Sequence, residues 1–155
     1  MMRFTALPTD IVRHWQNGGS DAHGQTPERV ISNGDGNRCR HCLGLVPEGE
    51  TYLIVAHRPF GSLQPYAECG PLFVCANPCM RHEDDHALPA TLQSATNYLI
   101  KGYSWDERIV YGTGVIVTPA EMDARAKDIF ADPQIAFIHI RSARNNCYQA
   151  RIDRD

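Results

Sequence analysis

The sequence has little that would link the protein to a membrane or to nucleic acid. No apolar run is long enough to span a bilayer, and neither end shows the apolar segment of a secretory signal. Basic residues are not in excess, because 15 Lys and Arg residues face 18 Asp and Glu residues and the net charge is −3. Nucleic-acid binders usually have a basic surface. We therefore expect a cytoplasmic protein that binds neither a membrane nor nucleic acid.

Internal repeats and shifts of composition are also missing, so nothing marks a domain boundary. A chain of 155 residues suits one domain that buries a core without depending on disulfides. Residues 17–37 are polar and rich in glycine, interrupted only by Val30 and Ile31. We predict a single domain over residues 1–155, with residues 17–37 as a flexible surface excursion that has room for a short edge strand.

Strand patterns outnumber helix patterns along the chain. One helix is predicted after Pro8, with Ile11 and Trp15 on one face, and a second after Thr118, where Glu121 completes a capping box. Strands are predicted at residues 3–7, 52–57, 71–74, 97–103, 109–117, 135–140 and 147–152. Because the strands group as hairpins, we predict an α+β fold with a mostly antiparallel sheet and two main helices.

Four of the six cysteines are arranged as two close pairs, and they are the strongest signal in the sequence. Cys39 and Cys42 form the first pair, and Cys75 and Cys79 follow after an interval of 32 residues. Two such turns can direct four sulfurs to one point, as a tetrahedral zinc site requires. A Pro/Gly turn and a β-rich run follow the first pair, so we predict a zinc-knuckle-like hairpin of the treble-clef type. With four thiolates the site would be closed and therefore structural.

Other interpretations of the cysteines stay open at this point. They could be buried free thiols, because free cysteine behaves as a small hydrophobic residue, and their even number is compatible with disulfides. A redox role for Cys39-x-x-Cys42, with His41 between the thiols, normally requires a helix at the motif, whereas a strand-rich segment follows here. Cys69 and Cys147 have no cysteine near them in the sequence. We expect that neither binds metal nor forms a disulfide.

The histidines are weaker signals. His82 and His86 have a metal-like spacing beside two aspartates, but a short charged run of this kind usually forms solvated surface. His57 and His139 each lie in a predicted strand, where a single histidine is usually packed and hydrogen-bonded. We assign no site to any of the four.

The segment Arg141–Tyr148 is the best candidate for function outside the cysteines. It connects two apolar strands and contains guanidinium and amide groups, which bind carboxylate or phosphate. The predicted ligand-binding residues are Arg141, Ser142, Arg144, Asn145 and Asn146. One alternative is a structural turn whose arginines pair with Asp153 and Asp155. Another is an enzyme site in which Cys147 or His139 is the reactive group.

Four stretches of the sequence are distinctive: Cys39–Leu43, Pro65–Glu68 with Gly70–Pro71, Ile109–Gly114 and Arg141–Gln149. In these residues the chain resembles a bacterial family catalogued as domain of unknown function 1203. The resemblance covers the chain from Cys39 to its end, and more weakly the first strand and helix. It implies one small α+β domain and brings no established activity. The family pattern tends to have His at the position of Cys75, and His is also a zinc ligand.

These observations lead to two hypotheses about function. The first is a zinc-stapled α+β domain, not an enzyme, that binds a small anion or a protein partner. The second is an enzyme that acts on a small anionic substrate through the Arg141–Tyr148 segment. A pocket walled by Tyr111 and Tyr148 beside this segment would favour binding or catalysis over a structural turn.

Overall fold

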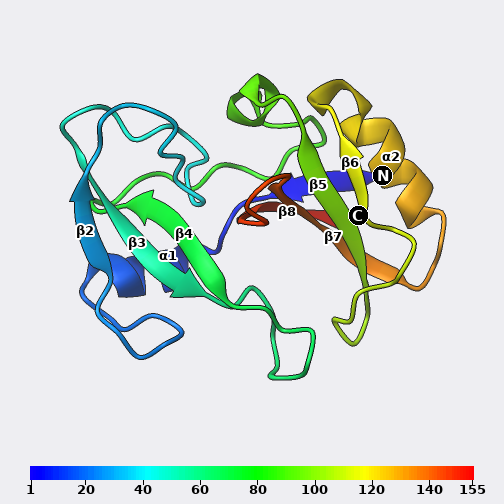
Figure 1. The fold of residues 1–155 in the computed structure, drawn as a ribbon, viewed down its shortest axis with the longest axis horizontal. Helices are drawn as coiled ribbons and strands as arrows, with labels where there is room; N and C mark the ends of the chain where they lie inside the picture. Colours follow the sequence, from blue (N-terminus) through cyan, green and yellow to red (C-terminus); the bar gives the residue numbers. More distant parts are fainter. The chain divides into compact units, whose positions relative to one another are not determined.

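Two compact units make up the structure, a computed structural model that describes all 155 residues. The first unit consists of Met1–Thr5, Pro59–Glu68 and Asp84–Asp155, and the second consists of Ala6–Arg58 and Cys69–Glu83. Each unit combines segments that are far apart in the sequence, and each contains one antiparallel sheet (Figure 1). The expectation that residues 1–155 form a single domain stays a prediction.

The first unit contains a five-stranded sheet. In spatial order its strands are β1 (Met2–Thr5), β8 (Tyr148–Arg154), β7 (Ile135–Ser142), β5 (Tyr98–Ser104) and β6 (Val115–Val117). All neighbouring strands are antiparallel. A 3-10 turn, η1 (Ala90–Ser94), precedes β5.

One face of this sheet lies against the core of the first unit. Alternate residues of a strand point to opposite faces, so Ile100 of β5 shares a face with its partner Ile140 of β7, and with Ile138. All three are fully buried. The helix α2 (Met122–Phe130) adds Met122, Ala126 and Ile129 to the same cluster. The other face of the sheet is therefore free to present polar side chains.

The start of α2 follows its predicted signal. A 3-10 turn, η2 (Pro119–Glu121), precedes the helix, with proline in its first position. The backbone N–H of Thr118 donates to the carboxylate of Glu121 over 2.8 Å, which completes the predicted capping box.

The second unit contains a three-stranded antiparallel sheet and one helix. The strands, in order, are β2 (Glu28–Ile31), β3 (Thr51–His57) and β4 (Gly70–Cys75), and the helix is α1 (Thr9–Gln16). The ring of Trp15 packs edge-on against His57 of β3, with ring centroids 5.2 Å apart. The buried residues of α1 are Val12 and Trp15, and Ile11, which lies on the same side of the helix as Trp15, is half-buried.

The predicted fold class is confirmed: the chain is α+β, with antiparallel sheets, two α-helices and a cluster of four cysteines. The main boundary error concerns β6, which begins at Val115 and not at residue 109. The hydroxyl of Thr113 accepts a hydrogen bond from the backbone N–H of Gly102 over 2.9 Å. A side chain thus takes the place of a strand carbonyl. Ile109 still forms an isolated bridge with Tyr103, so the predicted strand over residues 109–117 is interrupted before its regular pairing with β5 begins at Val115.

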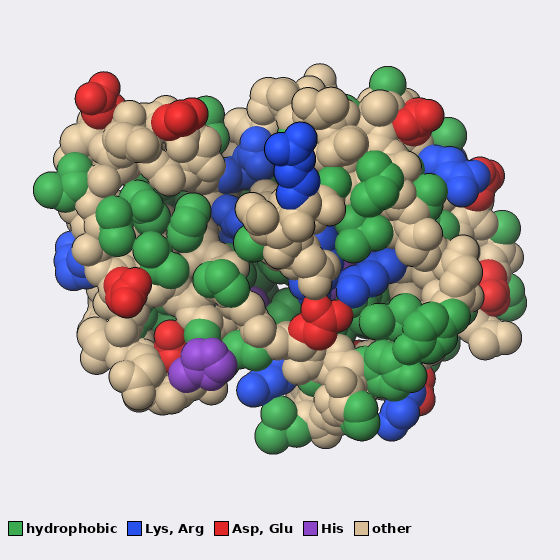
Figure 2. All heavy atoms as spheres, in the orientation of Figure 1, with side chains coloured by type: hydrophobic (Ala, Val, Ile, Leu, Met, Phe, Trp, Pro, Cys, Tyr) green, Lys and Arg blue, Asp and Glu red, His purple; other side chains and the backbone are tan.

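The helices and the surface charges bear on the predicted partners. Neither helix is long and apolar enough to cross a bilayer. On the face that Figure 2 shows, Lys and Arg side chains are interspersed with Asp and Glu side chains. The absence of nucleic-acid binding nevertheless stays a prediction.

Gly102, in the middle of β5, provides a test of the core of the first unit. A Cβ atom at this position would lie 3.0 Å from Cδ1 of Ile135 and 3.1 Å from Cγ2 of Ile129. We expect Gly102→Ala to lower the free energy of unfolding by about 1–3 kcal/mol, because the buried neighbours must move. Denaturant unfolding measures this change. Gly114→Ala is the control, since a Cβ atom at that position would have no neighbour within 4 Å; equal effects would contradict this account.

Candidate metal centre and polar cluster

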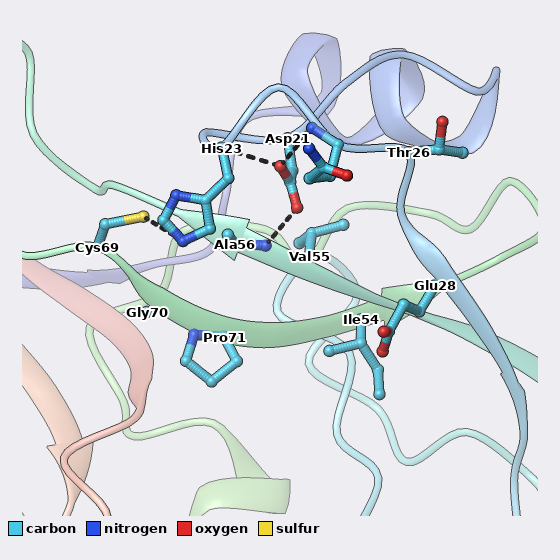
Figure 3. A pocket seen from close by; sticks show the side chains of 11 residues that line it. Asp21, His23, Thr26, Glu28, Ile54, Val55, Ala56, Cys69, Gly70 and Pro71 are labelled. Carbon is cyan, nitrogen blue, oxygen red and sulfur yellow. Dashed lines mark hydrogen bonds between the residues drawn. The ribbon is translucent and has the colours of Figure 1, made fainter.

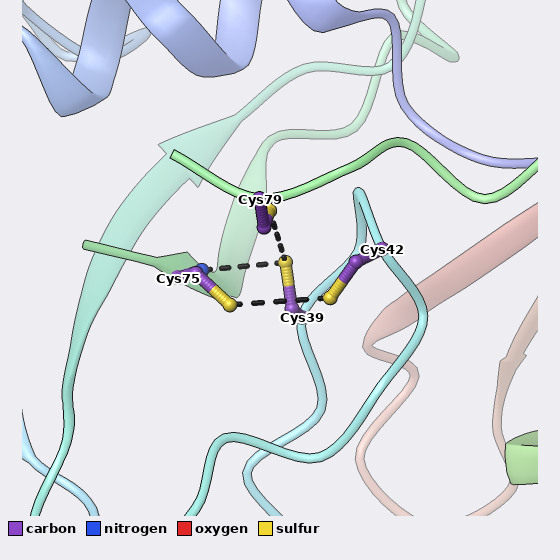
Figure 4. Close-up of side chains that lie close together, drawn as sticks. All are labelled: Cys39, Cys42, Cys75 and Cys79. Atoms are coloured by element: carbon purple, nitrogen blue, oxygen red, sulfur yellow. Dashed lines mark hydrogen bonds between the residues drawn. The ribbon is translucent and has the colours of Figure 1, made fainter. Parts of the chain in front are cut away.

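Four cysteines of the second unit meet at one point (Figure 4). The Sγ atoms of Cys39, Cys42, Cys75 and Cys79 all lie within 4.8 Å of one another. Sγ of Cys39 is 3.9 Å from Sγ of Cys79, and Sγ of Cys42 is 3.9 Å from Sγ of Cys75. Tetrahedral zinc, with Zn–S bonds of about 2.3 Å, places its sulfurs about 3.8 Å apart. The spacing therefore suits a four-coordinate metal ion and is too long for disulfides, in agreement with six free cysteines.

The first cysteine pair lies on a knuckle whose backbone points toward sulfur. The N–H groups of His41 and Cys75 are 3.4 and 3.3 Å from Sγ of Cys39. The N–H of Cys39 donates to the carbonyl of Gly44 over 2.9 Å and closes the turn. Leu43 takes the left-handed conformation, with φ of 57°, which is uncommon for a residue other than glycine. The predicted knuckle is present, with the left-handed position one residue before the glycine.

Side chains of α1 fix the backbone around the second pair. Nη2 of Arg13 donates to the carbonyl of Cys79 over 2.8 Å. Nε2 of Gln16 donates to the carbonyls of Cys75 and Asn77 over 2.8 and 3.0 Å. The helix, as well as the two turns, therefore determines where the sulfurs lie. No spacing in the sequence indicated this role of α1.

His41 forms a second layer behind the sulfurs. Its Nδ1 is 3.0 Å from Sγ of Cys79 and its Nε2 is 2.9 Å from Oγ1 of Thr9. Complete burial lowers the pKa of His41, and the charges of Arg13 and Arg81 lower it further. In a neutral imidazole, the N–H at Nδ1 can donate a hydrogen bond to Sγ of Cys79 while Nε2 accepts a hydrogen bond from the Thr9 hydroxyl. Such outer contacts orient the ligands of metal sites.

The pKa values of the four thiols indicate that four thiolates can coexist here only beside a positive charge. Hydrogen bonds from Cys42 and Cys75, and then from Cys79, hold the pKa of Cys39 well below its ordinary value. The hydrogen bond to Cys39 raises the pKa of Cys75 and of Cys79. The hydrogen bond with Cys39 raises the pKa of Cys42, but those with Cys75 and Cys79 bring it down to about 7. The thiols of Cys39 and Cys42 therefore ionise easily, whereas those of Cys75 and Cys79 ionise only when a positive charge offsets the negative ones. The cluster could hold a metal ion that supplies this charge.

Cys69 lies apart from this cluster, beside a cavity of about 420 Å³ in the second unit (Figure 3). Its Sγ is 4.0 Å from Nε2 of His23. The carboxylate of Asp21 accepts the backbone N–H groups of His23 and Ala56 over 2.9 and 3.0 Å, and so fixes this wall of the cavity. The prediction that Cys69 is not part of the metal site agrees with this position.

The other histidine candidates do not form a metal site, because the four cysteines are the only group of three or more ligand-type side chains that converge. His86 Nδ1 bonds to the carbonyl of Met2 over 2.7 Å, beside the bridge between Phe4 and Asp85. It therefore anchors the first strand of its own unit. The N–H of His82 donates to the carbonyl of His41 over 2.9 Å.

The two residues of the enzyme alternative, His139 and Cys147, do not come together in the structure. The register of β7 and β8 places His139 opposite Arg151, four residues beyond Cys147. At about 3.3 Å per residue this separates the two positions by about 13 Å along the strand. Sγ of Cys147 is instead 3.8 Å from the carbonyl of Asn145. A Cys/His nucleophile pair on this hairpin has no support in the register.

Arg141 and Arg144 occupy different environments, although the sequence grouped them in one site. Arg141 is buried, and its Nη1 donates to the carbonyl of Asn146 over 3.0 Å. Its Nη2 is 3.1 Å from Nδ1 of the fully buried His139. Arg144 and Asn145 are exposed in the loop between β7 and β8. Asn146 has φ of 57°, the left-handed conformation that asparagine tolerates best after glycine.

Glu68, which sequence reasoning missed, lies against Arg141. Its carboxylate is 3.0 Å from Nζ of Lys101, 3.1 Å from Nδ2 of Asn146 and 3.7 Å from Nη1 of Arg141. Burial raises the pKa of Glu68, but the hydrogen bond from Lys101 and the charge of Arg141 bring it below its ordinary value. The expected partners Asp153 and Asp155 bind elsewhere: Asp153 pairs with Arg151 over 2.7 Å and Asp155 lies near the N-terminus.

Aromatic rings surround this group on the face of the sheet opposite the core. Lys101 and Tyr103 of β5 are the register partners of His139 and Phe137 of β7. The ring of His139 lies 4.6 Å from that of Tyr103 and 5.1 Å from that of Phe60, measured between centroids. We call Glu68, Lys101, Tyr103, His139 and Arg141 the polar cluster.

Comparison with known proteins now gives the family. A family model described as "Protein of unknown function (DUF1203)" matches residues 36–154. The chain belongs to the DUF1203 family. Neither the curated proteins nor the solved structures contain a match.

The DUF1203 match includes all four clustered cysteines and all four stretches that resembled the family in sequence. Three of those stretches meet in the first unit. Tyr66 and Tyr111 pack with ring centroids 6.3 Å apart, and two residues after Tyr66 the Glu68 side chain meets Arg141 and Asn146. Segments about 40 residues apart in the sequence thus build one surface, which the motifs alone did not reveal.

His57 gives a test of pH dependence in the DUF1203 chain. Burial, with a contribution from Arg58, lowers its pKa from about 6.5 to about 4. The folded state therefore binds fewer protons than the unfolded state between these values, so its stability falls as the pH falls through this window. We expect the wild type to lose about 2 kcal/mol more than His57→Phe between about pH 7.5 and about pH 5. Denaturant unfolding at both pH values measures this, and parallel pH profiles would contradict it.

Proposed function

We propose that Cys39, Cys42, Cys75 and Cys79 hold one structural zinc ion. The observation behind this proposal is the distance of 4.8 Å or less between all four sulfurs. Zinc accepts four thiolates in a tetrahedron without redox chemistry, which suits a closed site with no open coordination position. The backbone N–H groups at Cys39 and the His41 contact to Cys79 would stabilise the thiolates. Zinc would then supply the charge that keeps four sulfurs together.

Metal analysis of the purified protein tests the zinc proposal. We expect about one zinc ion per chain, and a lower melting temperature in excess chelator, because metal binding is coupled to folding. The native chain should show at most two reactive thiols, Cys69 and Cys147, and all six after denaturation with chelator. Thr9→Val should lower the zinc affinity about 10-fold or more, since it removes the partner of His41.

Matched cysteine variants provide the control. Cys39→Ala should lose zinc and stability, whereas Cys69→Ala and Cys147→Ala should keep both, because their sulfurs lie outside the cluster. Protein that contains no metal and melts at the same temperature with and without chelator would end the proposal.

A second proposed function is the binding of a small anion at the turn between β7 and β8. The observation that favours it is the charge around Arg141: one carboxylate, Glu68, faces both Arg141 and Lys101. The proposed ligand-binding residues remain Arg141, Ser142, Arg144, Asn145 and Asn146. Arg141 would provide the buried charge, and the exposed Arg144 would approach the anion from solvent.

Sulfate or phosphate titration tests the anion proposal. We expect Arg144→Ala to lower the affinity at least about 10-fold, because a charge-assisted contact is lost, and to change stability by no more than about 0.5 kcal/mol. Arg29→Ala is the control, since this arginine is also exposed but lies on β2. Calorimetric titration and thermal melting give both quantities. Equal binding by the two variants would exclude Arg144 from the site. If Arg144→Ala unfolds, the loop is needed for the fold and the anion proposal is wrong.

A further inference from the structure

Two buried donors of the polar cluster have no acceptor. The guanidinium of Arg141 lies beside the hydroxyl of Tyr103 but cannot accept a hydrogen bond, so the hydroxyl proton meets no acceptor, and Nε of Arg141 has none either. Tyr103 is fully buried, and Arg141 is 4 % exposed. A buried donor without an acceptor costs free energy comparable with a lost hydrogen bond, so such a group in a native protein usually meets water or a ligand. The two donors lie on adjacent strands and on the same face of the sheet.

Both donors keep their protons near neutral pH. Burial raises the pKa of Tyr103 to about 12, although the charge of Arg141 opposes this shift. A guanidinium group stays charged at any physiological pH. The group that completes this surface must therefore be an acceptor.

The balance of charge indicates that the acceptor is negative. Within the polar cluster, Lys101 and Arg141 have side chains that are 12 % and 5 % exposed, and Glu68 is their single carboxylate partner. The neighbouring Arg151 is already paired with Asp153 over 2.7 Å. One positive charge in a mostly buried place is thus left without its own counter-charge, which favours an anionic ligand.

Glu68 shows that the basic groups beside these two donors bind a carboxylate. Its planar carboxylate takes hydrogen bonds from Lys101 and Asn146, but it does not bond to the Tyr103 hydroxyl or to Nε of Arg141. The Glu68 side chain is 36 % exposed, so it can turn toward solvent when another acceptor replaces it at Lys101. The rings of Phe60 and Tyr103, with centroids 5.3 Å apart, add an apolar wall beside the donors.

We propose that the polar cluster binds a small ligand through a carboxylate group. When the ligand is absent, Glu68 accepts a hydrogen bond from Lys101, one of the donors that the ligand uses. This inference rests on the proposed anion binding and narrows its ligand class. The ligand carboxylate accepts from the Tyr103 hydroxyl and from Arg141, and it displaces Glu68 from Lys101. The aromatic wall favours a carboxylate with a flat, apolar body.

Titration with benzoate, acetate and sulfate tests the inference on the wild type and on three variants of the full chain. Against the wild type, Glu68→Gln should bind benzoate about tenfold more tightly, because a competing acceptor and its negative charge are removed. Tyr103→Phe should bind benzoate about tenfold more weakly. Its melting temperature without ligand should not fall, since the hydroxyl proton has no acceptor in the protein. Glu83→Gln, an exposed residue of the second unit, is the control for net charge.

The possible outcomes separate this inference from the function on which it rests. Sulfate binding without benzoate or acetate binding would overturn the carboxylate class and keep the anion proposal. Binding of no anion by the wild type or by Glu68→Gln would overturn both. If Tyr103→Phe binds benzoate like the wild type, or if Glu83→Gln gains as much affinity as Glu68→Gln, the polar cluster is not the site. A lower melting temperature for ligand-free Tyr103→Phe would show that the hydroxyl serves the fold, and would also overturn the inference.

Discussion

Four sulfur atoms within 4.8 Å of one another can all ionise only if a cation lies among them, and much of the second unit is arranged around this constraint. The two turns that carry the cysteines are held by backbone N–H groups directed at Cys39 and by two side chains of α1. A three-stranded sheet with one helix buries little apolar surface, so a cross-link through a metal ion would add stability that packing alone does not provide.

In the first unit, the two faces of one sheet have different environments. One face is apolar and packs under α2, so its stability comes from burial. The opposite face places Lys101, Tyr103, His139 and Arg141 among aromatic rings, where charges and hydroxyl groups are costly unless they are paired. The carboxylate of Glu68 provides a negative partner for Lys101 and Arg141. The Tyr103 hydroxyl and Nε of Arg141 are left without an acceptor, which lowers the stability of this face.

The sequence predictions were right where the signal comes from residues that are close together in the chain. The capping box at Thr118, the proline of η2 and the strand over residues 135–140 are signalled by residues a few positions apart, and the structure confirms them. The errors came from contacts made in space. Thr113 shortened β6 by bonding to Gly102, and the register of β7 with β8 separated His139 from Cys147. Neither contact has a local pattern that a sequence could show.

The same distinction separates the two candidate sites. Cysteine spacing by itself predicted the four-cysteine cluster, because a Cys-x-x-Cys turn and a second close pair can direct four sulfurs to one point. Tertiary structure alone decided the polar cluster: Glu68 meets Arg141 across 73 residues, and β5 and β7 align Lys101 with His139. Ion pairs and register depend on which strands lie side by side. The sequence determined which groups are available, and the fold decided which of them share one low-dielectric place.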